Sequence, residues 1–152
     1  MLKRKNTYEK VLRLTEILNY IQTIPILHDN LALKGGTAIN LTIYDLPRLS
    51  VDIDLDFTTN VAREEMLEIR KTITETLLTY MDKSGYLLDP RSRQHHALDW
   101  FKFNYVNSSG LNDVIKIEIN YMLRCHILEP VTVKNKELGL IKSIDIRALN
   151  PY

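Results

Sequence analysis

The sequence predicts a single α+β domain. Its 152 residues are enough for one domain with its own core, and 45% hydrophobic with 26% charged residues is an ordinary globular balance. Two stretches repeat apolar residues at the spacing of an amphipathic helix. Several others alternate apolar and polar residues as half-buried strands do. We therefore expect helices and strands to share one core.

The two helical patterns cover residues 8–22 and residues 60–83. Pro25 interrupts the first pattern, because proline has no N–H to continue a helix. The second is expected to begin at an Asn60 N-cap and to end at Gly85. Its predicted buried stripe consists of Met66, Ile69, Ile73, Leu77 and Leu78.

The strand patterns are shorter and more numerous. A turn at residues 107–110 predicts that two of them form a hairpin. A short helix capped by Thr37 is expected at residues 38–44. The last residues, Ala148-Leu149-Asn150-Pro151, resemble a helix start, which predicts that the chain is the N-terminal part of a longer protein. The predicted strands are residues 31–33, 51–57, 86–88, 98–106, 114–122, 131–133 and 140–146.

Charge and cysteine content restrict the function. The net charge is +1, so no overall basic field attracts nucleic acid, and any RNA contact must come from a local patch. Cys125 is the only cysteine, so no internal disulfide can form and a reducing cytoplasm is expected. The basic N-terminus lacks a signal-peptide core, and no apolar run approaches the roughly 20 residues that span a bilayer. No membrane association is expected.

A glycine motif, Lys34-Gly35-Gly36-Thr37, follows the first predicted strand. Glycine lets the backbone come close to a ligand, and a helix that begins there offers free N–H groups to phosphate oxygens. The Thr37 hydroxyl adds a further donor. The motif therefore predicts a binding site for the phosphates of a nucleoside triphosphate. Two more candidates for phosphate contact precede the next strand, namely Arg48 and Ser50.

An acidic strand follows the glycine motif. Asp52, Asp54 and Asp56 alternate with apolar residues, so their side chains are expected on one face. Carboxylates at i and i+2 are suited to a divalent ion, and Mg²⁺ prefers oxygen ligands. A third carboxylate from a neighbouring strand is usual when two ions are bound. Glu118 is the best candidate for it, and Asp56 is the local rival.

Each of these residues also has a purely structural interpretation. Alternating aspartates on an edge strand can simply be solvated, and Gly35-Gly36 can be an ordinary strand-to-helix turn. Arg48 can pair with Asp45, and Ser50 can cap a turn. Three aspartates on one face nevertheless repel one another, so a counter-charge is expected. A metal ion, Lys34, Arg48 or Lys116 would supply that charge.

Other polar clusters are weaker candidates. His95-His96, together with Arg91 and Arg93, fits an RNA-facing loop or a solvated surface loop. Trp100 and Phe103 are expected in the core rather than as base-stacking residues. Cys125-His126 lacks partners at zinc-ligand spacing.

The compound motif resembles a known family. Lys34-Gly35-Gly36-Thr37-Ala38, followed by Arg48-x-Ser50-x-Asp52-Ile53-Asp54-Leu55, is similar to the signature of the AbiEii/AbiGii-type toxin nucleotidyltransferases of the polymerase β-like superfamily. The combination is far more specific than either half. Lys116-Ile117-Glu118-Ile119-Asn120 is similar to the family's later strand, so the resemblance covers the whole chain.

The resemblance implies a nucleotidyltransferase fold, a mixed β-sheet flanked by helices, and Mg²⁺-dependent transfer of a nucleotide from an NTP. Some members modify the acceptor end of tRNA, so an RNA acceptor, a toxin role in toxin–antitoxin or phage defence, and a cognate antitoxin are implied. By position, Gly36 and Thr37 match the phosphate motif. Asp52 and Asp54 match the metal-binding pair, and Glu118 matches the third carboxylate.

The resemblance also implies a missing part. Family members continue into a helical region whose lysine and later Arg-Asp pair help complete the active site. Residues 1–152 end before that region. We therefore expect an N-terminal fragment of the catalytic domain, which can be inactive even if its parent is an enzyme.

Two other functions fit the same residues. One is a non-catalytic nucleotidyltransferase-like module that binds a protein, and such a module would show no Mg²⁺-dependent nucleotide binding. The other is a small-molecule nucleotidyltransferase acting, for example, on an antibiotic hydroxyl. Transfer of labelled nucleotide to total RNA or to small acceptors separates that second function from an RNA-directed one.

Overall fold

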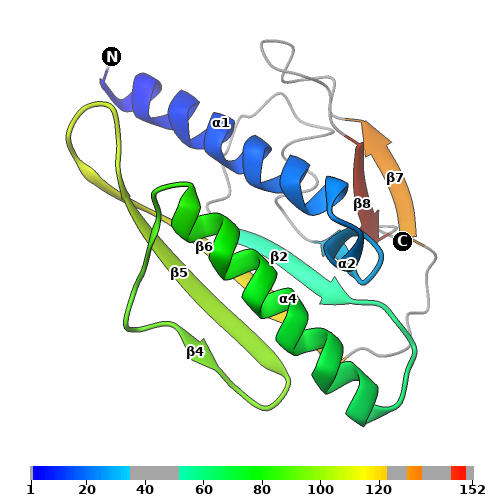
Figure 1. Ribbon diagram of the computed structural model, residues 1–152. Helices are drawn as coiled ribbons and strands as arrows, with labels where there is room; N and C mark the ends of the chain where they lie inside the picture. Colours follow the sequence, from blue (N-terminus) through cyan, green and yellow to red (C-terminus); the bar gives the residue numbers. More distant parts are fainter. Residues whose placement is uncertain (1, 35–51, 123–129, 135–144, 150–152) are drawn as a thin grey trace.

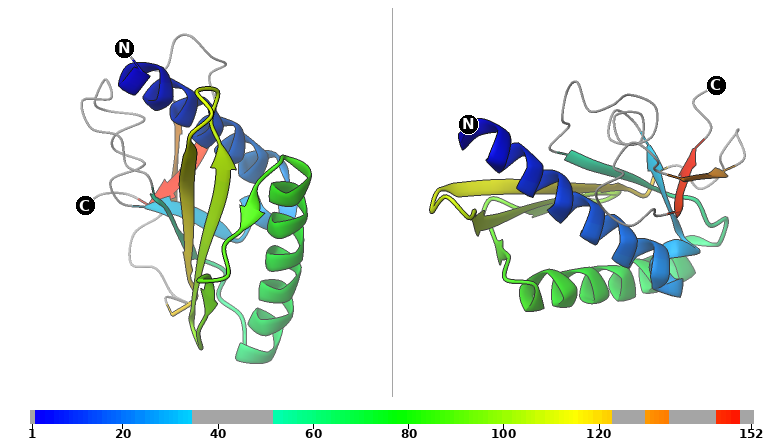
Figure 2. Two further views of the ribbon diagram at one scale, coloured as in Figure 1. Left: turned by 90° about the vertical axis from the view of Figure 1, so that its left-hand side faces the viewer. Right: turned by 90° about the horizontal axis from the view of Figure 1, so that it is seen from above.

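The fold is a mixed β-sheet with helices packed on one face. The computed structural model describes residues 2–34, 52–122, 130–134 and 145–149. Among these residues eight strands form one sheet, and α1 and α4 cover the same side of it (Figures 1 and 2). The predicted α+β class is confirmed.

The helices are α1 (Leu2–Thr23), α2 (Pro25–His28) and α4 (Arg63–Lys83). The strands are β1 (Leu31–Lys34), β2 (Asp52–Phe57), β3 (Leu87–Leu88), β4 (Arg93–Gln94), β5 (Leu98–Val106), β6 (Asn112–Asn120), β7 (Pro130–Lys134) and β8 (Asp145–Leu149). Their order is β3-β5-β6-β2-β1-β8-β7, and β4 also pairs with β5. The pairs β2–β6 and β1–β8 are parallel and the others antiparallel. The strand order places β2 at the centre of the sheet.

The core lies between this sheet and the two long helices. α1 buries its apolar stripe, and the strands contribute every second residue. In the predicted stripe of α4, Met66, Ile73 and Leu77 are buried, whereas Ile69 and Leu78 are only partly buried. Tyr20 of α1 and Tyr80 of α4 stack with ring centroids 3.7 Å apart. The largest fully buried side chains include Leu14, Ile17, Ile53, Leu55, Phe57, Ile73, Phe103 and Tyr121.

The first helix confirms its prediction and extends it. It contains residues 8–22 and ends at Thr23, where Pro25 becomes the first residue of α2. Proline suits that position because the first N–H groups of a helix have no intrahelical partner. At the other end of the sequence pattern for α4, Gly85 has φ +91° and terminates the helix as predicted.

The predicted start of the second long helix is wrong. The N-cap of α4 is Ala62, with no side-chain cap, instead of Asn60. The Thr58 N–H donates to the Asn30 carbonyl at 2.9 Å, and the Thr59 hydroxyl bonds the Asn30 side chain. These bonds hold the residues after β2 against the start of β1, so the helix begins later than its sequence pattern suggests.

The hairpin of β5 and β6 is confirmed with a small shift. β5 has the predicted bounds, and Gly110 in the turn has φ +80°. β6 begins and ends two residues earlier than predicted, because its register with β5 extends to the pair Val106 and Asn112. Its alternation is unchanged, so Ile117 faces the core.

The end of the chain differs from its prediction. Residues 131–133 lie within β7 as expected, but the last strand is β8. Ala148 and Leu149 belong to that strand, and the helix expected to start at Pro151 with Asn150 as its cap lies outside the described residues. The helix expected at residues 38–44 also lies outside them. None of the described helices is long and apolar enough to cross a membrane.

Candidate active site on the polar face of the sheet

Two aspartates of β2 lie on the sheet face opposite the helices. Ile53 and Leu55 are buried in the core, at 0% and 2% exposure, whereas Asp52 and Asp54 between them are partly exposed. The alternation follows from the strand, since successive side chains point to opposite faces. The acids therefore lie on the central strand, on the sheet face that α1 and α4 do not cover.

Glu118 joins these acids from the neighbouring strand. β2 and β6 run parallel, and the Cα of Asp54 is directly paired with that of Glu118. Neighbouring strands lie about 4.8 Å apart, so paired residues place their side chains side by side on one face. Glu118 is also partly exposed. Glu118 thus shares a sheet face with Asp54 and is paired with it, and its role as a third carboxylate stays a prediction.

Asp56 lies on the same side of β2 but is less accessible. Its Cα is paired with Asn120 on β6 and with Ala32 on β1. Only 1% of Asp56 is exposed. A ligand that enters from solvent reaches Glu118 more readily, so the geometry favours Glu118 over Asp56 as the third acid.

The glycine motif begins beside the same acids. Lys34 is the last residue of β1, and its Cα is paired with that of Asp54. Gly35 follows it directly in the chain, so the first residue of the motif lies in the same row as Asp54. Several predicted phosphate contacts lie outside the described residues, namely Gly35, Gly36, Thr37, Arg48 and Ser50.

The acids fit a divalent metal ion in donor type and in register. Carboxylate oxygens are the ligands that Mg²⁺ prefers, and Asp52 and Asp54 stand about 6–7 Å apart along one strand face. Within the described residues no three His, Cys, Asp or Glu side chains converge closely enough to hold an ion by themselves. The two aspartates would therefore share the ion with water and phosphate oxygens, as Mg²⁺ sites commonly do.

An aromatic ring and two lysines continue the site onto β5 and β6. Trp100 is paired with Glu118, and Lys102 is paired with Lys116, the neighbour of Asp52. The Lys116 Nζ lies 5.9 Å from the centroid of the Trp100 ring, within reach of cation–π attraction. The prediction that Trp100 is a core residue is wrong. Strand alternation places it, partly exposed, on the face with the acids.

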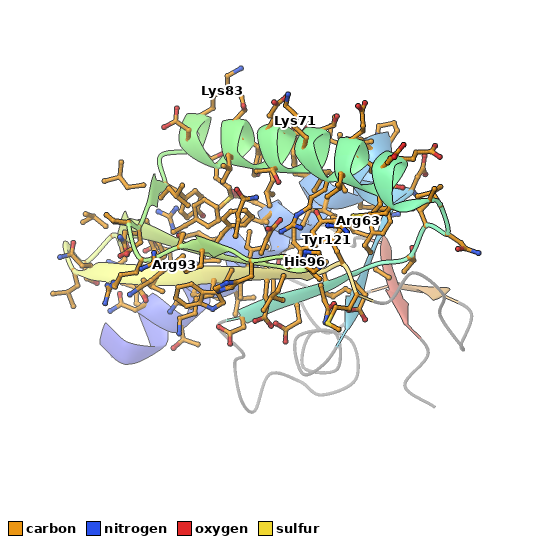
Figure 3. The ribbon with its side chains drawn as sticks, turned by 90° about the horizontal axis from the view of Figure 1, so that it is seen from below. Arg63, Lys71, Lys83, Arg93, His96 and Tyr121 are labelled. Atoms are coloured by element: carbon orange, nitrogen blue, oxygen red, sulfur yellow. The ribbon has the colours of Figure 1, made fainter. Side chains whose placement is uncertain are left out.

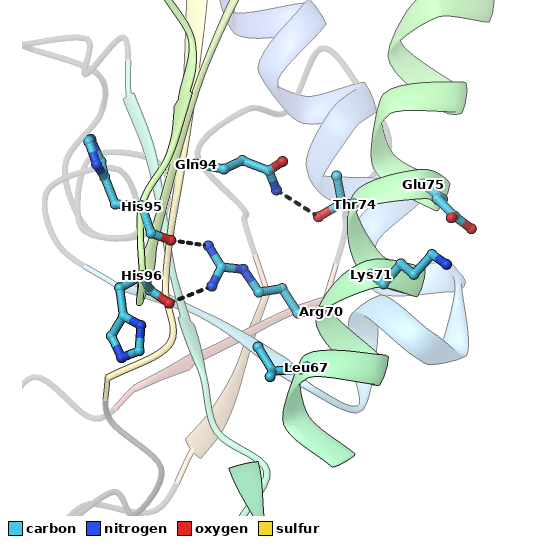
Figure 4. A pocket seen from close by; sticks show the side chains of 8 residues that line it. All are labelled: Leu67, Arg70, Lys71, Thr74, Glu75, Gln94, His95 and His96. Atoms are coloured by element: carbon cyan, nitrogen blue, oxygen red, sulfur yellow. Dashed lines mark hydrogen bonds between the residues drawn. The ribbon is translucent and has the colours of Figure 1, made fainter. Parts of the chain in front are cut away.

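A separate hollow lies on the helix side. It measures about 620 Å³ and is lined by residues of α4 and by Gln94, His95 and His96 (Figure 4). The Arg70 guanidinium donates to the carbonyls of His95 and His96 at 2.6 and 2.7 Å and to the Asp99 carboxylate at 2.6 Å. The positive charge of Arg70 is thus paired within the fold. Both imidazoles are exposed, as a solvated loop requires, and an RNA contact there stays a prediction.

Together, the fold and the acids define a class of protein: a nucleotidyltransferase-like α+β domain with a carboxylate pair on a central strand. The family model described as "Nucleotidyl transferase AbiEii toxin, Type IV TA system" matches residues 19–152. The chain belongs to this family, which confirms the resemblance and implies an antitoxin as its counterpart. No curated protein matches the chain.

Proposed function

We propose that this chain is the catalytic domain of a Mg²⁺-dependent toxin that transfers a nucleotide from an NTP to a hydroxyl of an RNA acceptor. The family resemblance suggests tRNA as that acceptor. One observation carries the proposal: Asp54 is paired with Glu118 on one side and with Lys34 on the other. The metal-type acids and the start of the phosphate motif are therefore adjacent.

Each part of this arrangement has a role in the proposed reaction. Asp52 and Asp54 hold Mg²⁺, with Glu118 beside them. When bound, Mg²⁺ neutralises the triphosphate and the leaving pyrophosphate. The N–H groups near Gly36 and the Thr37 hydroxyl bind the β- and γ-phosphates, as a helix N-terminus does for anions.

The chemical step is an in-line displacement at the α-phosphorus. The acceptor oxygen forms a bond to that phosphorus while the bond to the α–β bridging oxygen breaks. Pyrophosphate leaves with the bonding electrons, and the hydroxyl proton passes to solvent. The protein contributes mainly position and charge, which dominate catalysis of phosphoryl transfer.

The proposal is tested by nucleotide transfer with α-labelled NTPs to total RNA and to small hydroxyl acceptors, with and without Mg²⁺. Asp52→Asn and Asp54→Asn should each lower transfer by on the order of 100-fold, because each removes a fixed charge where charge develops. Asp82→Asn is the matched control, since Asp82 is exposed on α4 and distant in sequence from the site.

A thermal-shift measurement separates binding from turnover. Mg²⁺ with an NTP should raise the unfolding temperature of the wild-type chain and of Asp82→Asn, but not of the double variant Asp52→Asn/Asp54→Asn. Transfer that survives the double substitution would show that these acids are not the metal ligands. Transfer to small acceptors but not to RNA would identify a small-molecule enzyme instead.

A further inference from the structure

Three side chains lie next to the acids on the side away from the glycine motif. Trp100, Lys102 and Lys116, here called the β5–β6 strip, come from two antiparallel strands. Trp100 is paired with Glu118, and Lys116 with Asp52. The strip therefore extends the acidic rows sideways across the same face of the sheet.

The chemistry of the strip is that of a stacking platform with cations beside it. Trp100 is partly exposed, and the Lys116 Nζ lies 5.9 Å from its ring centroid. The Lys102 Nζ forms an ion pair at 3.9 Å with Asp89, whose carboxylate also accepts three bonds from Arg91. A partly exposed aromatic ring flanked by lysines suits a nucleobase stacked on the ring and phosphates near the ammonium groups.

The order of the strands indicates which nucleotide would occupy the strip. The sequence of neighbours is β1, β2, β6, β5, so Lys34, the first residue of the glycine motif, lies on one flank of the acids and the strip lies on the other. In an in-line displacement the leaving pyrophosphate and the attacking hydroxyl stand on opposite sides of the phosphorus. If the glycine motif holds the triphosphate, the acceptor approaches from the strip.

We propose that the β5–β6 strip binds the acceptor, as the single-stranded end of an RNA chain whose terminal base stacks on Trp100. This inference rests on the proposed function. Proteins generally recognise RNA at unpaired ends and loops, where free bases can stack on aromatic rings. Lys102 and Lys116 contact the adjoining phosphates, and this charge is a local patch on a chain whose net charge is only +1.

The strip contains its own reporter, because Trp100 is the only tryptophan of the chain. A short single-stranded oligoribonucleotide with a free 3′-hydroxyl should quench its fluorescence on titration, since a stacked base quenches the indole. An NTP with Mg²⁺ should leave the emission unchanged. Quenching by the NTP and not by the oligonucleotide would overturn the inference, because the strip would then hold the donor base.

Variants measure the contribution of each side chain to RNA binding by fluorescence anisotropy of a labelled oligonucleotide. Trp100→Ala should weaken binding about five- to 150-fold, which corresponds to ~1–3 kcal/mol per stacked base. Trp100→Phe keeps an aromatic face and should retain most of the affinity. Trp100→Phe also allows binding to be measured on a folded protein if Trp100→Ala unfolds. Equal affinity of all three proteins would overturn the inference.

The lysines have matched controls on the other side of the molecule. Lys71 and Lys83 project from α4 away from the sheet (Figure 3). Lys102→Ala and Lys116→Ala should each weaken binding. Each should also reduce the slope of log K against log salt concentration by about 0.7, the value for one phosphate of a single strand. Lys71→Ala and Lys83→Ala should change neither quantity, and an equal effect in both pairs would contradict a local strip.

Transfer assays keep this inference separate from the proposed function. If the wild-type chain transfers nucleotides and Trp100→Ala does so with an unchanged KM for RNA, the β5–β6 strip does not bind the acceptor and the proposed function stands. If the oligonucleotide quenches Trp100 but a chain that continues past residue 152 labels no acceptor, the strip binds RNA and the proposed function is wrong. A raised KM for RNA with an unchanged KM for the NTP supports both.

Discussion

Asp54 and Glu118 are direct Cα partners on neighbouring parallel strands, on the sheet face opposite the two long helices. Two acids in such a position repel each other, and like charges directly opposite each other destabilise a sheet. A pair of this kind is a stability cost that a bound cation would offset. A positively charged group is therefore expected beside this pair.

Substituting the two candidates for the third carboxylate distinguishes them. Glu118→Gln should lower nucleotide transfer at saturating Mg²⁺ by about 10- to 100-fold, the range for losing a group that supports a bound metal. Asp56→Asn should leave the rate nearly unchanged, because only 1% of Asp56 is exposed. Initial rates with circular dichroism as a folding check measure both, and the reverse pattern would assign the role to Asp56.

The end of α4 allows a clean test of backbone conformation. Gly85 has φ +91°, and a Cβ added there would meet no atom within 4 Å. Gly85→Ala should therefore destabilise the fold by about 1–2 kcal/mol through the left-handed backbone alone. Gly85→Asn is the matched control and should cost less, since asparagine visits that region more readily. Urea unfolding measures both, and equal losses would point to a different cause.

Local pattern was sufficient to predict most of the fold. Alternation fixed the two faces of β5 and β6, and helical spacing located α1 and α4, because each of these signals lies within one element. The start of α4 was missed because Asn30, far away in the sequence, holds the residues after β2. Such long-range bonds leave no mark on a local sequence pattern.

The candidate site was also predicted only in part, because local patterns do not reveal contacts between distant strands. Period-two spacing placed Asp52 and Asp54 together, but the pairing of Glu118 with Asp54 depends on a parallel ladder whose register no single strand reveals. Trp100 was assigned to the core because large aromatic residues usually are buried. Its own alternation within β5 was the signal that could have corrected this.

Asp89 should make stability depend on acid pH. Its carboxylate accepts bonds from Arg91 Nε at 3.0 Å and from Asn104 Nδ2 at 2.9 Å. The hydrogen bonds from Arg91, with that from Asn104, hold the pKa of Asp89 well below its ordinary value of 3.8. Below that ordinary value the unfolded chain binds more protons than the folded one. The stabilising effect is therefore complete above it and disappears as the pH falls further.

Urea midpoints from about pH 5 to about pH 2 test this pH dependence. The wild-type midpoint should fall on acidification, and Asp89→Asn should show a lower midpoint at pH 5 with a shallower fall. Asp82→Asn should follow the wild-type curve, because Asp82 is exposed on α4. An Asp89→Asn curve parallel to the wild type would show that Asp89 does not cause the dependence.

The ion pair of Arg70 and Asp99 links α4 to the sheet. Asp99 is 0% exposed, and Arg70 Nη2 donates to it at 2.6 Å while Gln94 donates to the same oxygen at 3.2 Å. Arg70→Met leaves a buried carboxylate without its cation, which should cost about 3–5 kcal/mol. The double variant Arg70→Met/Asp99→Leu should be more stable than Arg70→Met alone, because it buries no unpaired charge.

Equilibrium unfolding of these variants measures the loss, with Lys71→Met as the control on the exposed side of α4. A double variant no more stable than Arg70→Met would show that the lost carbonyl bonds matter more than the charge. The bonds from Arg70 to the His95 and His96 carbonyls hold the turn that leads to Ala97. The Ala97 carbonyl accepts a hydrogen bond at 2.8 Å from the N–H of Tyr121, the residue just beyond β6. Arg70→Met should therefore also speed amide exchange at Tyr121. Because Glu118 lies near the end of that strand, disorder there would lower nucleotide transfer without any change in the acids themselves.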